Sequence, residues 1–252
     1  MKKTLIAIMA LSGSVFGADN YQELWTLDFT KLQRTGSNVI VTLGDYTFKV
    51  WDGTLSSNGI TTNYTSSSLD RVHIVGDTGV TWGDDFAVEV VFTIPTGFDK
   101  ASNWPCIFNM FGEDNDDTLR FGPYTGKNSY GIDGVSSTAL VKPSENEKDW
   151  TDVTLTTDVQ HTALLSVIDG AVVLSIDGMV TAKGTLNQND NYFRSDIVID
   201  NMLIGGREDK ESNWGMDVTV SSLTMYKLVP EPTTATLSLL ALAGWAARRR
   251  RK

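Results

Sequence analysis

Apolar and polar side chains alternate along most of the chain, and this period of two is the feature that most restricts its fold. In the clearest case, residues 86–94, apolar side chains recur at every second position from Phe86 to Ile94, with Glu89 and Thr93 between them. Successive side chains of a β-strand point to opposite faces, so this pattern predicts a strand with one buried face. Because no segment between residues 19 and 228 has sustained helical periodicity, we expect an all-β protein.

The same pattern recurs in short segments separated by turn residues. Further strands are predicted at 25–29, 46–51, 72–75, 106–111, 119–122, 153–156, 163–168, 172–176, 197–199 and 216–226. Asp-Gly pairs at 169–170 and 177–178 favour hairpin turns, which makes residues 165–183 a three-stranded meander. Strands this numerous and closely spaced indicate an antiparallel sandwich or barrel. The single cysteine, Cys106, cannot form an intramolecular disulfide, but a chain of this length can bury enough apolar surface to be stable without one.

Four of these segments occur in an order that resembles the LamG-like, concanavalin A-like jelly rolls. They are residues 86–94, 161–178, 202–206 and 218–226, and the resemblance covers residues 80–228, with 19–80 as the opening strands. It implies that residues 19–228 form one antiparallel jelly-roll β-sandwich, with His161 a non-catalytic residue at the start of the meander. The superfamily includes lectins, adhesion modules and glycoside hydrolases, so the fold alone does not choose the function.

The first 18 residues have the organisation of a secretory signal peptide. Lys2 and Lys3 precede a short apolar run, and small residues follow it up to Ala18. We expect signal peptidase to remove residues 1–18 and to leave a mature chain that begins near Asp19. The alternative, a buried N-terminal helix, does not account for the order of these three parts.

The last 24 residues, 229–252, have a second characteristic order. Pro230, Glu231 and Pro232 precede an uncharged segment, residues 233–247, and the basic run 248–252 follows it. As a helix, the uncharged segment would be about 22 Å long, shorter than a hydrocarbon core of about 30 Å. The positive-inside rule would hold the basic end in the cytoplasm.

This tail resembles the PEP-CTERM sorting signal of Gram-negative bacteria. The resemblance implies a short transmembrane helix that holds the chain in the inner membrane transiently, until an exosortase-type protease cuts it. Pro230, Glu231 and Pro232 would then be recognition residues, and the body would reach the cell envelope, the cell surface or the extracellular matrix. A permanent anchor or a core helix is the alternative.

The charge of the body excludes some partners. Without the seven basic residues of the two termini and without Glu231, 14 basic side chains face 30 acidic ones, a net charge of −16. Such a surface repels phosphate backbones, so neither nucleic-acid binding nor adhesion to anionic lipid is expected.

The acidic residues lack the catalytic motif that is usual in jelly-roll glycoside hydrolases. Glycoside hydrolysis needs two carboxyl groups about 5 to 10 Å apart, which jelly-roll endoglucanases usually place on one strand as Glu-x-Asp-x-x-Glu. That pattern is absent; Glu89 is the lone acid on its strand, and Glu145, Glu147 and Asp149 lie in a loop where solvated charge is expected. With no GxSxG motif either, we expect no enzymatic activity; the alternative is a glycoside hydrolase or lyase whose acids come from separate loops.

Two loops carry nearly the same hexapeptide, residues 99–104 and 209–214, identical at five of six positions. If strands 86–94 and 216–226 pair antiparallel, both loops lie at one end of the sandwich. Tryptophan rings stack on sugars, and amides or carboxylates bridge their hydroxyls. A carbohydrate site is therefore predicted from Asp99, Asn103, Trp104, Asp209, Asn213 and Trp214, the alternative being that the tryptophans close the core and the polar residues cap turns.

A run of acidic residues at 113–117 could bind a cation. Asp114, Asp116 and Asp117 offer oxygen ligands of the kind that Ca²⁺ prefers, although the run is not an EF-hand. A solvated acidic turn is the other interpretation.

Taken together, these features predict an exported, non-catalytic surface protein that binds carbohydrate or matrix polysaccharide, with Ca²⁺ as an optional cofactor. A purely structural surface protein is a further alternative.

Overall fold

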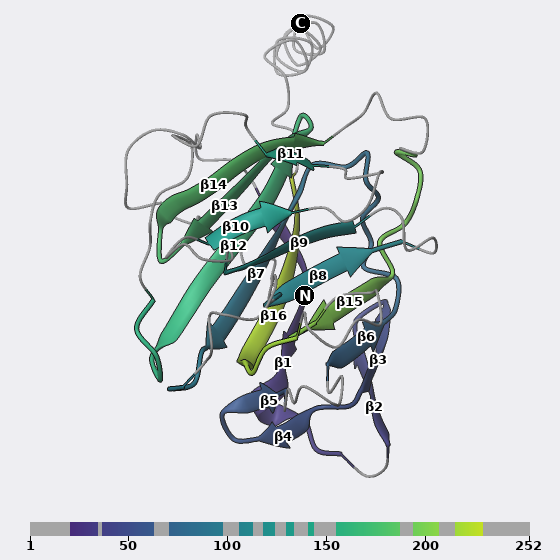
Figure 1. Cartoon of the computed structure of the whole chain (residues 1–252). Coiled ribbons are helices and arrows are strands. Elements are labelled where there is room, and N and C mark those ends of the chain that lie inside the picture. Colours follow the sequence, from purple (N-terminus) through teal and green to yellow (C-terminus); the bar gives the residue numbers. More distant parts are fainter. Residues whose placement is uncertain are drawn as a thin grey trace, which may run out of the picture.

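The computed structural model of the chain describes residues 21–34, 37–62, 71–97, 106–112, 118–123, 130–133, 141–143, 155–186, 194–206 and 215–228. These residues form two antiparallel sheets that face each other across one hydrophobic core (Figure 1). The expected all-β jelly-roll sandwich is thereby confirmed.

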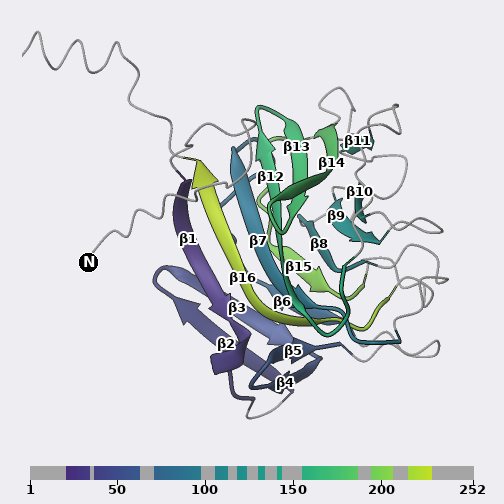
Figure 2. The same ribbon diagram turned by 90° about the vertical axis from the view of Figure 1, so that its left-hand side faces the viewer.

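One sheet has nine strands in the order β11-β14-β13-β12-β7-β16-β5-β4, and β1 also pairs with β16. The strands are β1 (Tyr21–Asp28), β4 (Thr54–Ser56), β5 (Gly59–Thr61), β7 (Phe86–Thr93), β11 (Val141–Pro143), β12 (Gln160–Ile168), β13 (Ala171–Ile176), β14 (Met179–Leu186) and β16 (Thr219–Leu228). The first and last strands, β1 and β16, therefore lie side by side (Figure 2).

The other sheet has seven strands in the order β10-β9-β8-β15-β6-β3-β2. They are β2 (Asn38–Leu43), β3 (Tyr46–Trp51), β6 (Val72–Val75), β8 (Phe108–Phe111), β9 (Thr118–Pro123), β10 (Tyr130–Asp133) and β15 (Asn201–Ile204). A single 3-10 turn, η1 (Phe29–Lys31), follows β1, and no α-helix occurs among the described residues.

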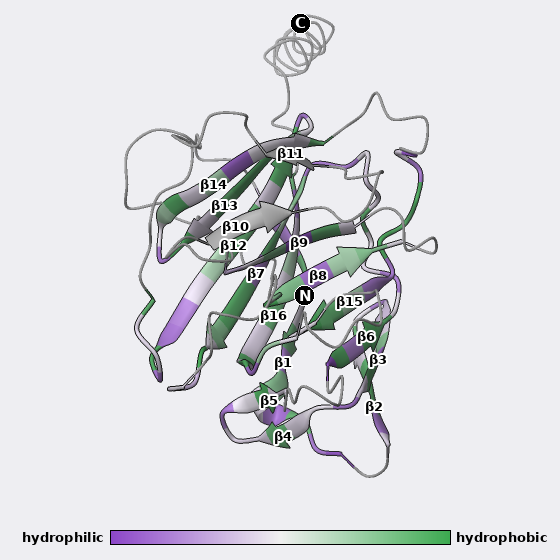
Figure 3. Ribbon diagram, viewed as in Figure 1, coloured by the Kyte–Doolittle hydropathy of each residue, from purple (hydrophilic) through white to green (hydrophobic). Residues whose placement is uncertain are grey.

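Strand β7 shows how the alternation builds the core. Phe86, Val88, Val90 and Phe92 are fully buried between the sheets, whereas Glu89 remains partly exposed on the outer face. Its neighbours β12 and β16 present apolar residues to the same core, and green predominates on β7 in Figure 3. Burying this many large side chains is the main source of stability for a fold without disulfides.

The predicted meander is also confirmed. Asp169 and Asp177 have positive φ angles of 49° and 51°, and each is followed by a glycine with positive φ. Both pairs form the turns that connect β12, β13 and β14. His161 lies near the start of β12, as expected, and Cys106 is buried.

Some predicted strands differ from the structure. Residues 197–199 make only an isolated bridge, Thr81 with Val198, although Ile199 N–H also donates to the Val80 carbonyl. Residues 155 and 156 are not in a strand, and 153–154 lie outside the described residues. The short strands β4 and β5 were not predicted, because three residues are too few to show a period of two.

Within the described part of the chain, no helix has the length and hydropathy needed to span a bilayer. The predicted signal peptide, residues 1–18, and the predicted sorting tail, residues 229–252, lie outside that part. Both remain predictions.

Candidate functional site

Three ring side chains form a row on the outer face of the seven-stranded sheet. Trp51 of β3 is paired with His73 of β6, and their ring centroids are 5.7 Å apart in an edge-to-face arrangement. His73 in turn stacks on Phe111 of β8, with centroids 6.5 Å apart and planes 25° apart. These residues share one face because residues directly opposite in an antiparallel sheet point the same way.

Polar groups are built into this row. The Asn201 side-chain N–H donates to Asp200 (2.6 Å), which turns the Asn201 oxygen toward His73 Nε2, 2.9 Å away. Since that oxygen can only accept, Nε2 carries the proton. The Lys49 ammonium lies 4.4 Å from the Trp51 ring centroid, a cation–π contact.

We name Trp51, His73, Phe111 and Asn201 the ring face. Trp51 is 37% exposed, so part of its ring faces solvent. Asn109 and Arg120 continue the same face toward β9 and are almost fully buried. A partly exposed indole beside oriented amide and imidazole groups can stack on a sugar ring and bond its hydroxyls.

The outer face of the nine-stranded sheet carries a different group. Glu89 of β7 lies opposite Thr224 of β16, and Thr224 lies opposite Thr26 of β1. The Thr26 hydroxyl donates to the Glu23 carboxylate (2.7 Å) and lies 3.1 Å from the Thr224 hydroxyl. Glu23 and Glu89 therefore flank β16 on one face, with backbones two strand spacings apart, about 10 Å.

Tyr226 lies next to these two acids on β16 and is buried. Burial and, secondarily, the negative charge of Glu23 raise the pKa of Glu89. Burial, followed by the charges of Glu89 and Glu23, raises the pKa of Tyr226 to about 12. The arrangement places a carboxyl with a raised pKa, Glu89, beside a more exposed one, Glu23, and an acid and base pair needs two carboxyls in different environments.

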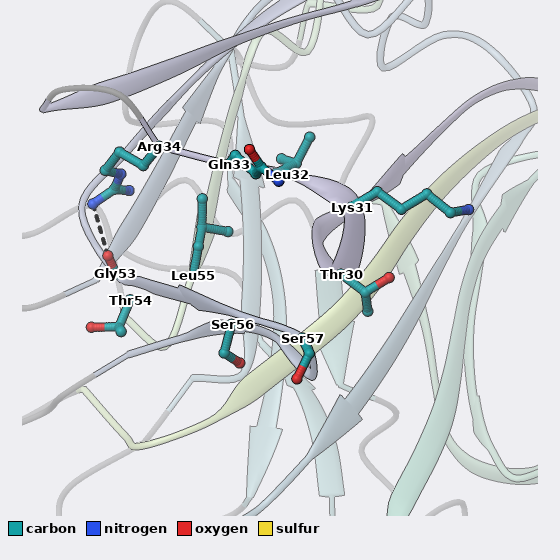
Figure 4. A pocket seen from close by; sticks show the side chains of 10 residues that line it. All are labelled: Thr30, Lys31, Leu32, Gln33, Arg34, Gly53, Thr54, Leu55, Ser56 and Ser57. Atoms are coloured by element: carbon teal, nitrogen blue, oxygen red, sulfur yellow. Dashed lines mark hydrogen bonds between the residues drawn. The ribbon is translucent and has the colours of Figure 1, made fainter.

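Described residues line two pockets that bear on function. One, of about 810 Å³, lies between residues 30–34 and 53–57, with Leu55 pointing between the two segments (Figure 4). Arg34 bridges it, donating to the carbonyl of Gly53 (2.8 Å) and to that of Asp52. This guanidinium holds the two segments together, so we assign it a structural role; the second pocket is described below.

The residues predicted to bind carbohydrate or calcium lie outside the described part of the chain. These are Asp99, Asn103, Trp104, Asp209, Asn213 and Trp214 for carbohydrate, and Asp114, Asp116 and Asp117 for calcium; Pro230, Glu231 and Pro232 also lie outside it. The strands that flank the two hexapeptides do pair antiparallel as expected, with Thr93 opposite Thr219. Among the described residues, no cluster of three or more His, Cys, Asp or Glu side chains could hold a metal ion.

Sequence reasoning missed the ring face because its members come from four strands. Trp51 and Phe111 each end a predicted strand; Trp51 is exposed at an outward position of the alternation, whereas Phe111 is buried. A large aromatic at an outward position was the available signal. Nothing in the sequence indicated that His73 and Asn201 would lie between them.

No protein-family model matches the chain, and no curated protein is similar to it in sequence. Its structure is similar to Trypanosoma rangeli sialidase, with 13% identity and a TM-score of 0.53, over 82% of this chain and 31% of the sialidase. Streptomyces sioyaensis endo-1,3-beta-glucanase is 17% identical, with a TM-score of 0.49 over 87% of this chain and 100% of the glucanase. Crh5 transglycosylase is 15% identical, with a TM-score of 0.46 over 82% of this chain and 84% of that protein.

The chain thus spans about a third of the sialidase, and at such low identity the similarity shows a shared fold. The sialidase is an enzyme by name, and this similarity contradicts the expectation that the protein is not an enzyme. That expectation rested on the lack of an acid motif within one strand. Strand pairing brings acids from distant parts of the chain onto one face, as with Glu23 and Glu89, so the missing motif excludes nothing.

Proposed function

We propose that the chain is a carbohydrate-active protein that binds a glycan on the ring face. The observation that carries this proposal is the row Trp51–His73–Phe111 on one sheet face, with the Asn201 amide oriented beside it. Flat rings of this kind contact the C–H faces of sugars, and the imidazole and amide groups offer hydrogen bonds to hydroxyls.

The charges around the ring face bear on which glycan fits. Lys49 places one cation at the exposed edge of Trp51, whereas the body between the predicted terminal signals has a net charge of −16. Long-range repulsion therefore opposes a polyanionic chain. We propose a neutral polysaccharide as the partner.

Binding to a panel of polysaccharides tests the proposal directly. The purified full-length protein would be run in native gels that contain 1,3-β-glucan, cellulose, xylan, chitin fragments or a polyuronate, each with Ca²⁺ or with EDTA. Retardation by at least one neutral glycan is expected. Binding to the polyuronate alone would contradict the charge argument, and binding to none would contradict the proposal.

A second candidate function is glycoside hydrolysis or transglycosylation. Two observations favour it: Glu23 and Glu89 share one face beside Tyr226, and burial raises the pKa of Glu89, the direction that suits a general acid. Glycoside hydrolysis uses two carboxyl groups on either side of the scissile bond, and these two acids flank β16 on one face.

Reducing-sugar release from the same panel tests this candidate. Glu89→Gln is expected to abolish release while leaving ring-face binding unchanged, since the two faces belong to different sheets. The control is Glu23→Gln, which should lower turnover rather than binding if both acids act. Turnover that survives both changes would place the chemistry elsewhere in the protein.

We further propose that the protein works outside the cytoplasm after removal of residues 1–18 and cleavage near Pro230, Glu231 and Pro232. The order of basic, apolar and small residues at one end, and of Pro-Glu-Pro, apolar and basic residues at the other, supports this. Intact-mass analysis of protein from the native envelope should find neither residues 1–18 nor the run 248–252. Detection of the complete tail in surface fractions would contradict the proposal.

A further inference from the structure

The second pocket, of about 760 Å³, opens at one end of the sandwich. Residues 82–85 precede β7, residues 169–170 form the β12–β13 turn, and Lys227 and Leu228 end β16; all of these line it. Trp82 and Val167, both 1% exposed, also line the pocket, so it reaches down to the hydrophobic core. We name it the end pocket.

The indole of Trp82 has an unused hydrogen-bond donor. Its Nε1 is buried and has no acceptor in the described part of the chain, although the ring is held in the core beside Phe86. The other core indole differs, since Trp25 Nε1 donates to the Thr78 carbonyl at 2.9 Å. A buried donor without an acceptor destabilises the fold, so a ligand that supplies an acceptor here is favoured.

Around this donor, the pocket wall supplies both kinds of polar group. Asp84 pairs with the Lys227 ammonium at 2.7 Å and also accepts from the Thr81 N–H at 2.9 Å. Asp85 caps the β12–β13 turn by accepting from the Asp169 N–H at 2.8 Å, through one of its two carboxylate oxygens. The Asp169 side chain is exposed and makes no hydrogen bond to another described residue, so it can accept from a ligand.

We propose that the end pocket is a second binding site, one that takes a neutral polyhydroxylated ligand of the size of a single sugar residue. A ligand hydroxyl donates its proton to Asp85 or Asp169, and a small turn of the Trp82 ring, whose Nε1 is closed to solvent in this structure, lets a hydroxyl oxygen accept from that N–H. The volume lies within the range of small-ligand pockets, about 300–1,000 Å³. This site lies apart from the ring face and does not depend on it.

The same groups disfavour the other ligand classes. Three carboxylates against one ammonium repel an acidic sugar or a phosphate. A cation would prefer the oxygens but would be repelled by Lys227 and would leave the Trp82 N–H without an acceptor. Burial alone would raise the pKa of Asp84, but the Lys227 ammonium and the Thr81 N–H outweigh it and lower that pKa, so Asp84 stays ionised and paired.

Proton–nitrogen NMR of the tryptophan side chains gives a direct readout. Trp82→Phe identifies the Trp82 indole resonance in the full-length protein by its loss. Glucose, galactose, mannose, N-acetylglucosamine, glucuronate and Ca²⁺ would then be titrated singly into the wild type. At least one neutral sugar is expected to shift that resonance, with glucuronate and Ca²⁺ without effect.

Asp169→Gly tests the wall of the pocket, because glycine keeps the positive φ of the turn and removes only the carboxylate. The matched control is Asp52→Gly, the same change at another Asp-Gly turn with positive φ, φ 58°. Asp169→Gly should weaken sugar binding at least about fivefold, while Asp52→Gly leaves it unchanged.

The proposal is overturned if no neutral sugar shifts the Trp82 resonance, if Ca²⁺ alone shifts it, or if both glycine variants bind alike. Failure of the ring face would appear differently. Polysaccharide retardation would then be absent while the Trp82 resonance still responded to a sugar.

Discussion

Replacing Trp51 with alanine is the sharpest test of the ring face. The indole of Trp51 is 37% exposed, and a tryptophan presents up to about 250 Å² of side-chain surface, so about 90 Å² of this ring is free to contact a ligand. At about 25 cal/mol per Å² of apolar surface, covering it contributes at most about 2 kcal/mol. Trp51→Ala should therefore weaken glycan binding up to about thirtyfold.

The assay is a calorimetric titration with an oligosaccharide of whichever glycan the panel identifies. Trp51→Phe keeps part of the ring and should show an intermediate loss. Met179→Ala is the matched control, because Met179 is a comparably exposed apolar residue (52%) on the other sheet, and its loss should leave binding unchanged.

Stability separates a binding effect from a folding effect. Because Trp51 is at the surface, the alanine variant should melt within a few degrees of the wild type and keep its strand signal in circular dichroism. If a folded Trp51→Ala protein binds the glycan within twofold of the wild type, stacking of the sugar on the ring face is refuted.

Three further changes probe the sheets. Glu89 has a raised pKa in the folded state, so the wild type loses stability as the pH rises above 4.5, the ordinary pKa of glutamate. Glu89→Gln should abolish this loss. In urea titrations the variant should be more stable than the wild type at pH 7 but not at pH 4. The rise of the Tyr226 pKa from 10.0 to about 12 destabilises the wild type by at most about 3 kcal/mol between pH 10 and 12. Tyr226→Phe should therefore show a smaller alkaline decrease in melting temperature. Gly59 has φ 127°, and a Cβ there would lie 2.2 Å from the Val220 carbonyl oxygen. Gly59→Ala should therefore lower the free energy of unfolding by about 3 kcal/mol or more in the same urea titrations. An unchanged free energy of unfolding would contradict the close approach of β5 to β16.

Local alternation predicts the strands of this protein well wherever one face is buried. The strands at 46–51 and 72–75 have the predicted bounds, and both Asp-Gly turns of the meander form as expected. In each case the information lies within a few residues, in the side-chain period or in the tolerance of aspartate and glycine for positive φ. The irregular segment 197–199 was mistaken for a strand because it shares the apolar composition of one.

The candidate sites depend instead on pairings between distant strands. Glu23 and Glu89 meet only because β1 and β7 both flank β16, and His73 meets Asn201 only because β6 pairs with β15. The sheet order, not the spacing within a segment, decides these neighbours. The sequence of one strand therefore shows Glu89 without its neighbour Glu23. It also does not show that four strands bring the ring face together.

The pairing of the first strand with the last constrains when this protein can fold. Thr26 and Thr224 are in contact although 198 residues separate them, and β16 also supplies partners to β5 and β7. A chain that emerges N-terminus first must therefore keep β1, β5 and one edge of β7 without their partner until nearly the whole domain has emerged. Unpaired strand edges can pair with other chains and cause aggregation. These edges stay unpaired until β16 has been made and has paired with them. The domain therefore folds after its synthesis rather than during it.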